Sequence, residues 1–503
     1  MEYLLAHDLG TSGNKATLFS ENGELVSSCV YSYNVNFFNG NWAEQNPEDF
    51  WRAVCSTSVE MAKLVGPENI AAVSFSGQMM GCICVDDKGE ALRPSIIWAD
   101  QRAVKENKTI SNLIDKDEFY SITGHRNSEA YSIQKFMWIK NNEPEVYGKT
   151  YKMLNAKDYV IHKLTGEFLS DFTDASGTNA YAITENKWSE KVLDAAGIPL
   201  SKMPELFDST HIAGKVSYEA ARECGLLAGT RVVLGGGDGS CAAAGAGATV
   251  DGKVYCCLGS SAWVMLASKA PVIDKERMVV NWASMRKGIV HPCGTMQTAG
   301  LSYSWMRDNI CKFEKEHANE NESVYSLINN QIEESVVGSN GLLYLPYLMG
   351  ERSPRWNPYA KGCFIGLKAE HTRKDLLRSV VEGVTMNLCV ILDVFRKYGV
   401  TNIDEMLLIG GGAKSPVWMK IMADCFGVDI LRPNYIEEAT SMGAALAAGV
   451  GVGIFKDFSE ISKFLKVEER IKPDLENTEK YKKIMPVFND AYYALCNVFD
   501  KLS

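Results

Sequence analysis

Asp8-Leu9-Gly10-Thr11-Ser12-Gly13-Asn14-Lys15 is the stretch on which the interpretation of this sequence depends. Apolar runs at residues 3–6 and 15–19 flank it, so the two glycines lie in a tight turn between two predicted strands. Glycine lets the backbone fold so that successive N–H groups and the hydroxyls of Thr11 and Ser12 point at one spot, where an anion can bind. Asp8 would repel a bare phosphate there, but it suits a phosphate that carries Mg²⁺. Glycine, serine and threonine are also ordinary turn residues, so the turn alone leaves a purely structural role open.

The composition limits the class of protein. With 503 residues the chain is too long for one core, and two large domains are expected. The net charge of −10 leaves no basic excess with which to bind nucleic acid. We find no leader-like start and no apolar run long enough to span a membrane, and we interpret the 14 scattered cysteines as reduced thiols. These features predict a cytoplasmic protein with neither a nucleic-acid nor a membrane partner.

The glycine-rich pattern returns in the middle of the chain. A predicted buried strand at 231–234 leads into Gly235-Gly236-Gly237-Asp238-Gly239, and a helix of small residues is predicted over 241–248. Three glycines allow a close approach to the backbone, and the aspartate is presented at the start of the helix. The strands predicted at 254–258 and 262–266 are joined by Gly259-Ser260-Ser261, a partial echo of the opening turn. A duplicated fold explains this repetition, and it predicts domains at 1–245 and 246–503.

A third junction between a strand and glycines lies further along the chain. Residues 406–409 form a predicted buried strand that ends in Gly410-Gly411-Gly412, whose bare backbone could accept a flat adenine ring. The common nucleotide-binding motifs are missing. Gly148-Lys149-Thr150 matches the end of a P-loop, but Glu143 stands where the first glycine of that motif should be. Two phosphate-binding turns in two halves of one chain resemble the actin-like (ribonuclease-H-like) ATPase fold. The expected architecture is therefore α/β, with two such domains and a cleft between them.

Two other predicted strands end in polar residues, as the ligand-binding strands of α/β proteins do. Residues 70–75 lead into Ser76-Gly77-Gln78-Met79-Met80-Gly81, and residues 96–99 lead into Asp100-Gln101-Arg102. Asp100 and Arg102 could instead form a local ion pair that holds a loop, and for Arg102 we favour that interpretation.

In their order and spacing, these segments resemble the FGGY family of carbohydrate kinases over nearly the full length of the chain. Any one match is weak, whereas the ordered set is specific. Beyond the stretches already quoted, the matching segments are 135–139, 157–159, 164–166, 345–347, 350–354, 362–367, 375–382 and 440–445.

The resemblance implies roles for the candidate residues. Asp238 would be the base that takes a proton from the primary hydroxyl of the sugar, and Asp8 would hold Mg²⁺. The family also implies a small-molecule sugar and ATP as substrates, and a homodimer. The other candidates form a sugar-contacting set (Gln78, Met79, Met80 and Asp100) and an ATP-contacting set (Thr11, Ser12, Lys15, Gly259, Ser260, Gly411, Gly412 and Ser415).

One departure from the family pattern concerns the sugar. Members that phosphorylate xylulose usually carry Gly-Gln-Met-His where this chain has Gly77-Gln78-Met79-Met80, so a thioether replaces a histidine that could bond a sugar hydroxyl. Glycerol is disfavoured, because the charged pair of glycerol kinases is missing at the corresponding positions. The resemblance implies transfer of the γ-phosphoryl group of ATP to a ketopentose, first of all D-xylulose to D-xylulose 5-phosphate. Ribulose, a tetrulose, a deoxy-ketose and erythritol stay open, and Met80 could also merely pack.

Two functions of other classes are also considered. An actin- or chaperone-like ATPase would couple the nucleotide to polymerisation or partner binding, but those folds lack the segments at 77–81, 98–102 and 362–382. A sensing member would bind sugar without turnover, and the intact Asp8 and Asp238 argue against it.

Overall fold

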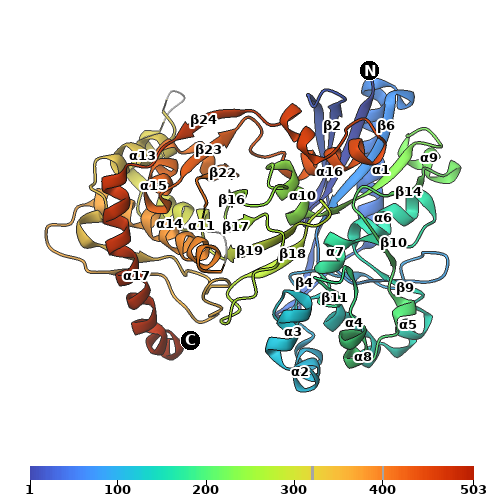
Figure 1. The fold of residues 1–503 in the computed structure, drawn as a ribbon, viewed down its shortest axis with the longest axis horizontal. Coiled ribbons are helices and arrows are strands. Elements are labelled where there is room, and N and C mark those ends of the chain that lie inside the picture. The colour runs from blue at the N-terminus through green and yellow to red at the C-terminus, as the bar shows by residue number, and fades with distance from the viewer. Residues whose placement is uncertain (319–321, 399–401, 503) are drawn as a thin grey trace.

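Each half of the chain is built around one mixed β-sheet (Figure 1). The computed structural model describes residues 1–318, 322–398 and 402–502. The order across the first sheet is β14 (Ile212–Lys215), β15 (Arg231–Gly237), β6 (Ile70–Gly77), β1 (Tyr3–Leu9), β2 (Gly13–Ser20) and β3 (Leu25–Ser32). Strands β15, β6 and β1 are parallel, and the other three run antiparallel to their neighbours.

The second sheet repeats this plan. Its order is β18 (Val280–Ala283), β19 (Val290–Met296), β17 (Ala262–Leu266), β16 (Val254–Leu258), β22 (Glu405–Ile409), β23 (Asp429–Pro433) and β24 (Val467–Ile471). Strands β23, β22 and β16 are parallel, a hairpin continues from β16 into β17, and β24 closes the far edge antiparallel. The parallel trio and its hairpin occupy equivalent places in both sheets, as a duplicated fold requires.

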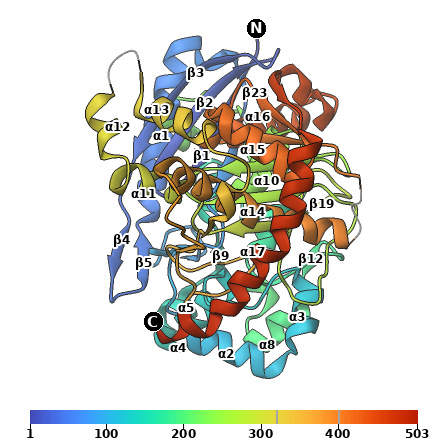
Figure 2. The same ribbon diagram turned by 90° about the vertical axis from the view of Figure 1, so that its left-hand side faces the viewer.

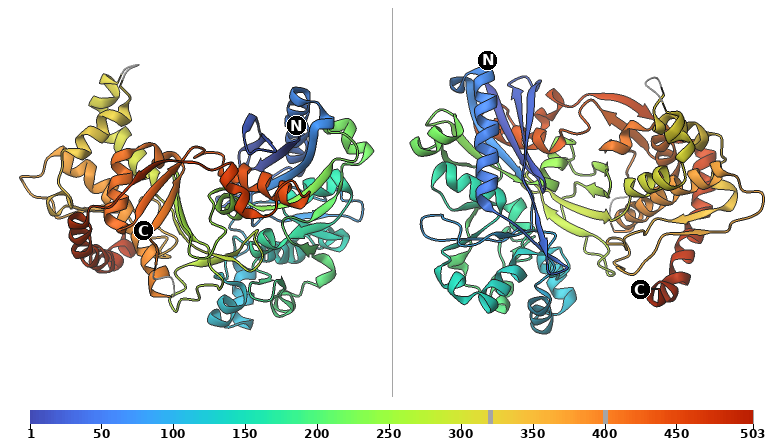
Figure 3. Two further views of the ribbon diagram at one scale, coloured as in Figure 1. Left: turned by 45° about the horizontal axis from the view of Figure 1, so that its top comes forward. Right: turned by 180° about the vertical axis from the view of Figure 1, so that it is seen from behind.

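Alternation along the strands gives the first sheet two apolar faces. Leu5 and Leu18 belong to the core under α1 (Pro47–Val65), α6 (Ala156–Thr165) and α9 (Tyr218–Cys224), which cover the outer face. Figure 3 shows α1 lying along that outer face. Leu4 and Ala6 point the other way, into a core shared with the second half.

Two helices made of small residues form the layer between the sheets. They are α10 (Asp238–Gly245) and α16 (Ala439–Gly451), and their core includes residues of both sheets, such as Val233 and Leu407. The helices cross closely because glycine stands at the contacts: a Cβ on Gly443 would lie 2.0 Å from the Cys241 carbonyl oxygen. In Figure 3, the orange-red segment that contains α16 lies against the blue first sheet.

Helices of the second half cover the outer face of the second sheet, around the largest apolar core. Figure 2 shows α17 running across this side of the molecule. These helices are α11 (Gly300–Asn309), α12 (Lys312–His317), α13 (Val324–Glu333), α14 (Arg373–Lys397), α15 (Pro416–Phe426) and α17 (Leu475–Lys501). A two-stranded sheet of β20 (Leu343–Leu345) and β21 (Cys363–Ile365) packs beside them.

An accessory region with its own core extends the first half, and Phe119 and Phe136 lie at its centre. Its helices are α2 (Val104–Leu113), α3 (Lys116–Thr123), α4 (Ser132–Asn142), α5 (Pro144–Lys149), α7 (Phe172–Ser176) and α8 (Glu190–Ala196). The short strands of the first half are β4 (Asn36–Phe38), β5 (Trp42–Gln45), β7 (Ile83–Val85), β8 (Ser95–Ile96), β9 (Lys152–Leu154), β10 (Leu169–Asp171), β11 (Tyr181–Ala182), β12 (Lys187–Trp188) and β13 (Glu205–Phe207).

Two expectations from the sequence need comment. The helix predicted over 241–248 begins three residues earlier, because Gly237 serves as its N-cap and an aspartate is favourable in the first turn. The domain division at 245/246 stays a proposal, since α16 comes from the second half yet also packs on the first sheet. None of the helices in the described parts of the chain is long and apolar enough to cross a membrane.

Candidate active site

Asp8 lies near the carboxyl end of β1, where hydroxyls from two distant segments hold its side chain. Ser76 Oγ donates to Asp8 Oδ1 over 2.8 Å, and Thr440 Oγ1 donates to Oδ2 over 2.9 Å. Ser76 stands opposite Asp8 in the neighbouring strand β6, and Thr440 lies in the first turn of α16. Burial raises the pKa of Asp8, and the two hydroxyls act in the opposite direction. Neither hydroxyl was predicted as a partner of this carboxylate.

Asp238 lies at the same edge of the sheet. Gly237 pairs with Gly77 of β6, and Gly77 pairs with Leu9 of β1, so the ends of three parallel strands stand side by side. Asp238 follows directly as the first residue of α10. Its side chain is open to solvent, yet protein surrounds it closely enough that desolvation, together with the charge of Asp8, raises its pKa to about 7. Two carboxylates 230 positions apart are thus close enough to interact.

The opening turn is fixed by aromatic side chains. Tyr33 donates its hydroxyl to the carbonyl of Gly10 over 2.6 Å, and the Trp98 indole donates to Thr11 Oγ1 over 2.9 Å. Ser12, at the tip of the turn, is exposed. A turn that is held in place and exposes one hydroxyl is an arrangement that can receive a phosphate.

Lys15 makes an ion pair of 3.0 Å with Glu438, the residue before α16. This contact joins β2 of the first half to the second half. In the structure the ammonium group of Lys15 has the Glu438 carboxylate as its partner. The predicted contact between Lys15 and the nucleotide stays a prediction.

In the second sheet, two glycine turns also stand side by side. Cys257 of β16 is in register with Ile409 of β22, so the turns that follow them, at 259–261 and 410–412, meet at one edge. The carbonyl of Ser260 accepts hydrogen bonds from Ala299 and Leu301, at the start of α11. This edge of the second sheet corresponds to the edge of the first sheet that carries Asp8.

The glycines at 410–412 differ in what surrounds them. Gly410 has a φ of +86°, and a Cβ on Gly412 would lie 2.3 Å from the Leu258 side chain. Gly411 is exposed and faces open space, so a flat ring could approach its backbone. Ser415 caps α15 and lies 3.2 Å from the amide oxygen of Asn329. Its contact with a nucleotide stays a prediction.

The predicted sugar-contacting residues follow β6. Gln78 donates to Gln45 over 2.8 Å, while its own amide oxygen is buried without a hydrogen-bond partner among the described residues. Met79 is buried against the corner that precedes Asp238, since a Cβ on Gly237 would lie 2.5 Å from its sulfur. Met80 has a φ of +63°, and Lys135 Nζ donates to its carbonyl over 2.8 Å.

Asp100 is held by contacts within its own part of the first half. Its side chain is fully buried, and Arg102 contacts both of its oxygens, at 2.9 and 2.7 Å. The backbone N–H of Ala43 donates to Oδ2 over 2.6 Å. This geometry favours the local ion pair, and a contact between Asp100 and a sugar stays a prediction.

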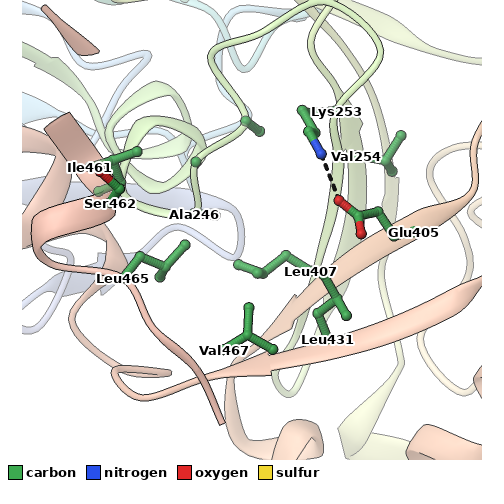
Figure 4. A pocket seen from close by; sticks show the side chains of 12 residues that line it. Ala246, Lys253, Val254, Glu405, Leu407, Leu431, Ile461, Ser462, Leu465 and Val467 are labelled. Carbon is green, nitrogen blue, oxygen red and sulfur yellow. Dashed lines mark hydrogen bonds and ion pairs between the residues drawn. The ribbon is translucent and has the colours of Figure 1, made fainter. Parts of the chain in front are cut away.

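A cavity of about 260 Å³ lies between the second sheet, the segment 246–248 that follows α10, and the segment 461–467 (Figure 4). Leucines 407, 431 and 465 make its lining largely apolar, and Lys253 forms an ion pair of 2.6 Å with Glu405 at its edge. Val254 and Glu405 are the first residues of β16 and β22. The cavity therefore lies at the opposite ends of these strands from the glycine turns, and it is separate from the candidate site.

Comparison with protein families settles which group of proteins shares this arrangement. Residues 3–245 match the N-terminal domain of the FGGY family of carbohydrate kinases, and residues 254–452 match its C-terminal domain. The chain belongs to the FGGY family of carbohydrate kinases. As an FGGY kinase it is a phosphotransferase that acts on a sugar and uses ATP, and its fold is the two-domain actin-like fold of this family.

Individual FGGY kinases resemble the chain over its whole length. A xylulose kinase of Bacillus subtilis (strain 168) is 32% identical over 498 residues, which cover 98% of this chain and 97% of the relative. A gluconokinase of the same organism is 29% identical over 502 residues, or 100% of this chain and 98% of the relative. The ligand-bound crystal structure of a xylulose kinase from Lactobacillus acidophilus superimposes with a TM-score of 0.92 over 100% of both chains, at 26% identity.

Proposed function

We propose that this FGGY kinase transfers the γ-phosphoryl group of ATP to the primary hydroxyl of a ketopentose, with D-xylulose as its main substrate and D-xylulose 5-phosphate as its product. The observation that carries the proposal is the meeting of Asp238 with Asp8 at the ends of β15 and β1, the two parallel strands on either side of β6. Similarity to kinases named for xylulose supports the choice of sugar.

In this proposal Asp238 takes the proton of the sugar hydroxyl. The hydroxyl oxygen forms a bond to the γ-phosphorus, the bond from that phosphorus to the β–γ bridging oxygen breaks, and ADP leaves. A pKa of about 7 suits this role, because a base works best when its pKa lies near the working pH. Phosphoryl transfer otherwise depends on positioning, which rigid turns can provide, and on charge neutralisation, for which an oriented carboxylate would hold a cation.

Asp8 fits the role of Mg²⁺ ligand in its donor chemistry. Mg²⁺ prefers oxygen ligands and commonly takes one or two carboxylates together with phosphate oxygens. In the described part of the chain no group of three or more His, Cys, Asp or Glu side chains is arranged to hold a metal ion, which fits an ion held by a carboxylate together with the substrate phosphates. When bound, the ion would neutralise phosphate charge. Thr11, Ser12, Lys15, Gly259, Ser260, Gly411, Gly412 and Ser415 are proposed to hold the nucleotide.

Gln78 and Met80 are proposed to face the sugar. The amide oxygen of Gln78, for which the described parts of the chain offer no hydrogen-bond partner, can accept a hydrogen bond from a sugar hydroxyl, which would relieve the cost of burying it alone. Met80 adds a thioether, so this side of the sugar is contacted by apolar surface.

Gluconate is the second candidate, because gluconokinases match the chain at nearly the same identity. A relative named for xylulose is 32% identical to the chain and a gluconokinase is 29% identical, and this difference supports D-xylulose as the first candidate.

An ADP-release assay with a panel of acceptors tests the proposal. The panel holds D-xylulose, D-ribulose, a tetrulose, a 1-deoxy-ketose, erythritol, glycerol and gluconate. We expect kcat/KM to be highest for D-xylulose. A higher value for gluconate would establish the second candidate, and ADP release that no acceptor stimulates would favour the actin-like ATPase.

The variant Asp238→Asn supplies the test of mechanism. It removes the base while keeping size and shape, so kcat should fall ~10²–10⁴-fold and ATP binding, measured by calorimetry, should stay intact. Unchanged turnover in this variant would refute the assignment of Asp238.

A further inference from the structure

A buried charged cluster lies directly behind the corner that carries Asp238. Lys157 of α6 is fully buried, and its ammonium group lies 2.6 Å from Asp158, 2.9 Å from Asp171 and 3.5 Å from Asp174. These three carboxylates are also buried. Burying an ammonium group among three carboxyl groups is costly unless their geometry and hydrogen bonds compensate for it, so a cluster of this kind needs an explanation.

Asp171 connects the cluster to the hydroxyl of Thr173. One of its oxygens faces Lys157, and the other accepts hydrogen bonds from Ser209 Oγ over 2.7 Å and from Thr173 Oγ1 over 2.6 Å. The Thr173 hydroxyl gives its only proton to Asp171, so its lone pairs are left free to accept.

The free lone pairs of Thr173 reach the backbone of the corner. The N–H of Gly237 donates to Thr173 Oγ1 over 2.9 Å. Gly237 is the last residue of β15, the N-cap of α10 and the residue immediately before Asp238. A continuous path of polar contacts therefore runs from Lys157 through Asp171 and Thr173 to the peptide group that precedes the proposed base.

Close packing makes the corner depend on this contact. A Cβ on Gly236 would lie 2.7 Å from Thr173 Oγ1, and one on Gly237 would lie 2.5 Å from the sulfur of Met79. The backbone of 236–237 is thus held between the Thr173 hydroxyl and the Met79 side chain, with no room for larger residues. Any change at the Thr173 hydroxyl acts on the position of this backbone.

We propose that Thr173, held by Asp171 and Lys157, is a positioning residue that fixes the Gly237 peptide and through it the carboxylate of Asp238. This inference rests on the proposed function, in which Asp238 is the base. The Lys157 ammonium group holds Asp171 through their ion pair, the carboxylate orients the Thr173 hydroxyl, and the hydroxyl holds the N–H. Thr173 contacts no reacting atom, so its effect lies in alignment, and misalignment by about 1 Å can cost ~10²-fold in rate.

The test compares three substitutions of Thr173 with a matched control. Thr173→Val keeps the shape but removes both hydrogen bonds, and Thr173→Ser keeps both. Thr178→Val is the control, since Thr178 is an equally buried threonine whose hydroxyl bonds the Ala175 carbonyl and the Ala180 N–H and does not contact Gly237.

We expect kcat of Thr173→Val to fall ~10–100-fold, with KM for ATP and for the sugar changed less than about threefold. Thr173→Ser should retain kcat within about threefold of the unmodified enzyme, as should Thr178→Val once rates are normalised to folded protein. If the valine variant does not fold, Thr173→Cys decides, because a thiol is a weak donor and acceptor. Its kcat should then lie at least about fivefold below that of Thr173→Ser.

Three results would overturn the positioning role: an unchanged kcat in Thr173→Val, an equal loss in Thr178→Val, or a loss confined to KM. If the cysteine variant has to decide, a kcat equal to that of Thr173→Ser counts in the same way. The variant Asp238→Asn, measured in parallel, distinguishes a failure of the proposed base from a failure of the positioning role. Full turnover in Asp238→Asn removes the proposed base itself, whereas an inactive Asp238→Asn beside a fully active Thr173→Val removes only the positioning role.

Discussion

The carboxylate of Asp8 is defined by its two hydroxyl partners. Ser76 reaches it from the neighbouring strand, and Thr440 reaches it from the helix that joins the second half to the first. Each oxygen of the carboxylate is thereby given a fixed direction. A metal or phosphate group bound at Asp8 would therefore meet a carboxylate whose orientation depends on both halves of the chain.

Replacing Thr440 tests this dependence. Thr440→Val removes one hydrogen bond to a partly buried carboxylate, a loss of roughly 1–3 kcal/mol, so the affinity for Mg-ATP should fall about tenfold by calorimetry. Ser441→Ala is the control, because the next hydroxyl along the same helix has no hydrogen-bond partner among the described residues. Equal affinities in the two variants would contradict a role for Thr440 in orienting Asp8.

Individual residues show where sequence reasoning reaches its limit. Strand and turn patterns place Asp8 and Asp238 at strand ends, because those patterns are local. The bond between Thr440 and Asp8 joins residues 432 positions apart, and no local pattern contains it. The choice between a sugar contact and an ion pair at Asp100 likewise depends on burial, which the spacing of Asp100 and Arg102 does not fix.

At the scale of elements, the contact between α10 and α16 determines how the halves meet. Both helices are built from small residues, so their backbones approach closely and bring the start of α16 to Asp8. Composition predicts that such helices are buried. It does not say that they pack on each other, because glycine and alanine allow many close packings.

Gly443 provides the test at this scale. In Gly443→Ala the new methyl group would stand 2.0 Å from the Cys241 carbonyl, so the helices must separate, and we expect the free energy of unfolding to fall by about 1–3 kcal/mol or more in urea denaturation. Gly148→Ala in α5 is the matched control, since nothing lies within 4 Å of its added Cβ. That variant should be neutral or more stable, by up to about 1 kcal/mol. A neutral Gly443→Ala would contradict the close crossing.

For the whole molecule, the matching topology of the two sheets confirms that the fold is duplicated, as the repeated glycine turns predicted. The two halves also meet at a second junction, which the repeated glycine turns did not predict. There the loop after α3 meets β18: the N–H of Asn281 donates to the Gly124 carbonyl over 2.9 Å, and the Tyr120 hydroxyl lies 2.8 Å from the Val279 carbonyl oxygen. The two halves are therefore joined at the central helices and again at this edge of the second sheet.

His125 lies in this second junction, and its burial makes the free energy of unfolding of the protein depend on pH. Its ring packs on Trp282 with centroids 4.5 Å apart, its Nδ1 lies 3.0 Å from the Tyr131 hydroxyl, and burial lowers its pKa from 6.5 to about 3. Between these values the unfolded chain binds a proton that the folded protein does not, so stability is lost as the pH falls below about 6.5. At pH 5.0 this one histidine should cost about 2 kcal/mol relative to pH 7.5.

The variant His125→Gln isolates this contribution from those of His7 and His291, which are buried with lowered pKa values as well. We expect the difference in unfolding free energy between pH 7.5 and 5.0, measured by guanidinium denaturation, to be about 2 kcal/mol smaller in the variant than in the unmodified protein. Because each protein is compared with itself at two pH values, any loss of stability from the substitution cancels. An identical pH dependence in both proteins would mean that His125 is protonated in the folded state, and the junction would then have to accommodate a buried charge between the two halves.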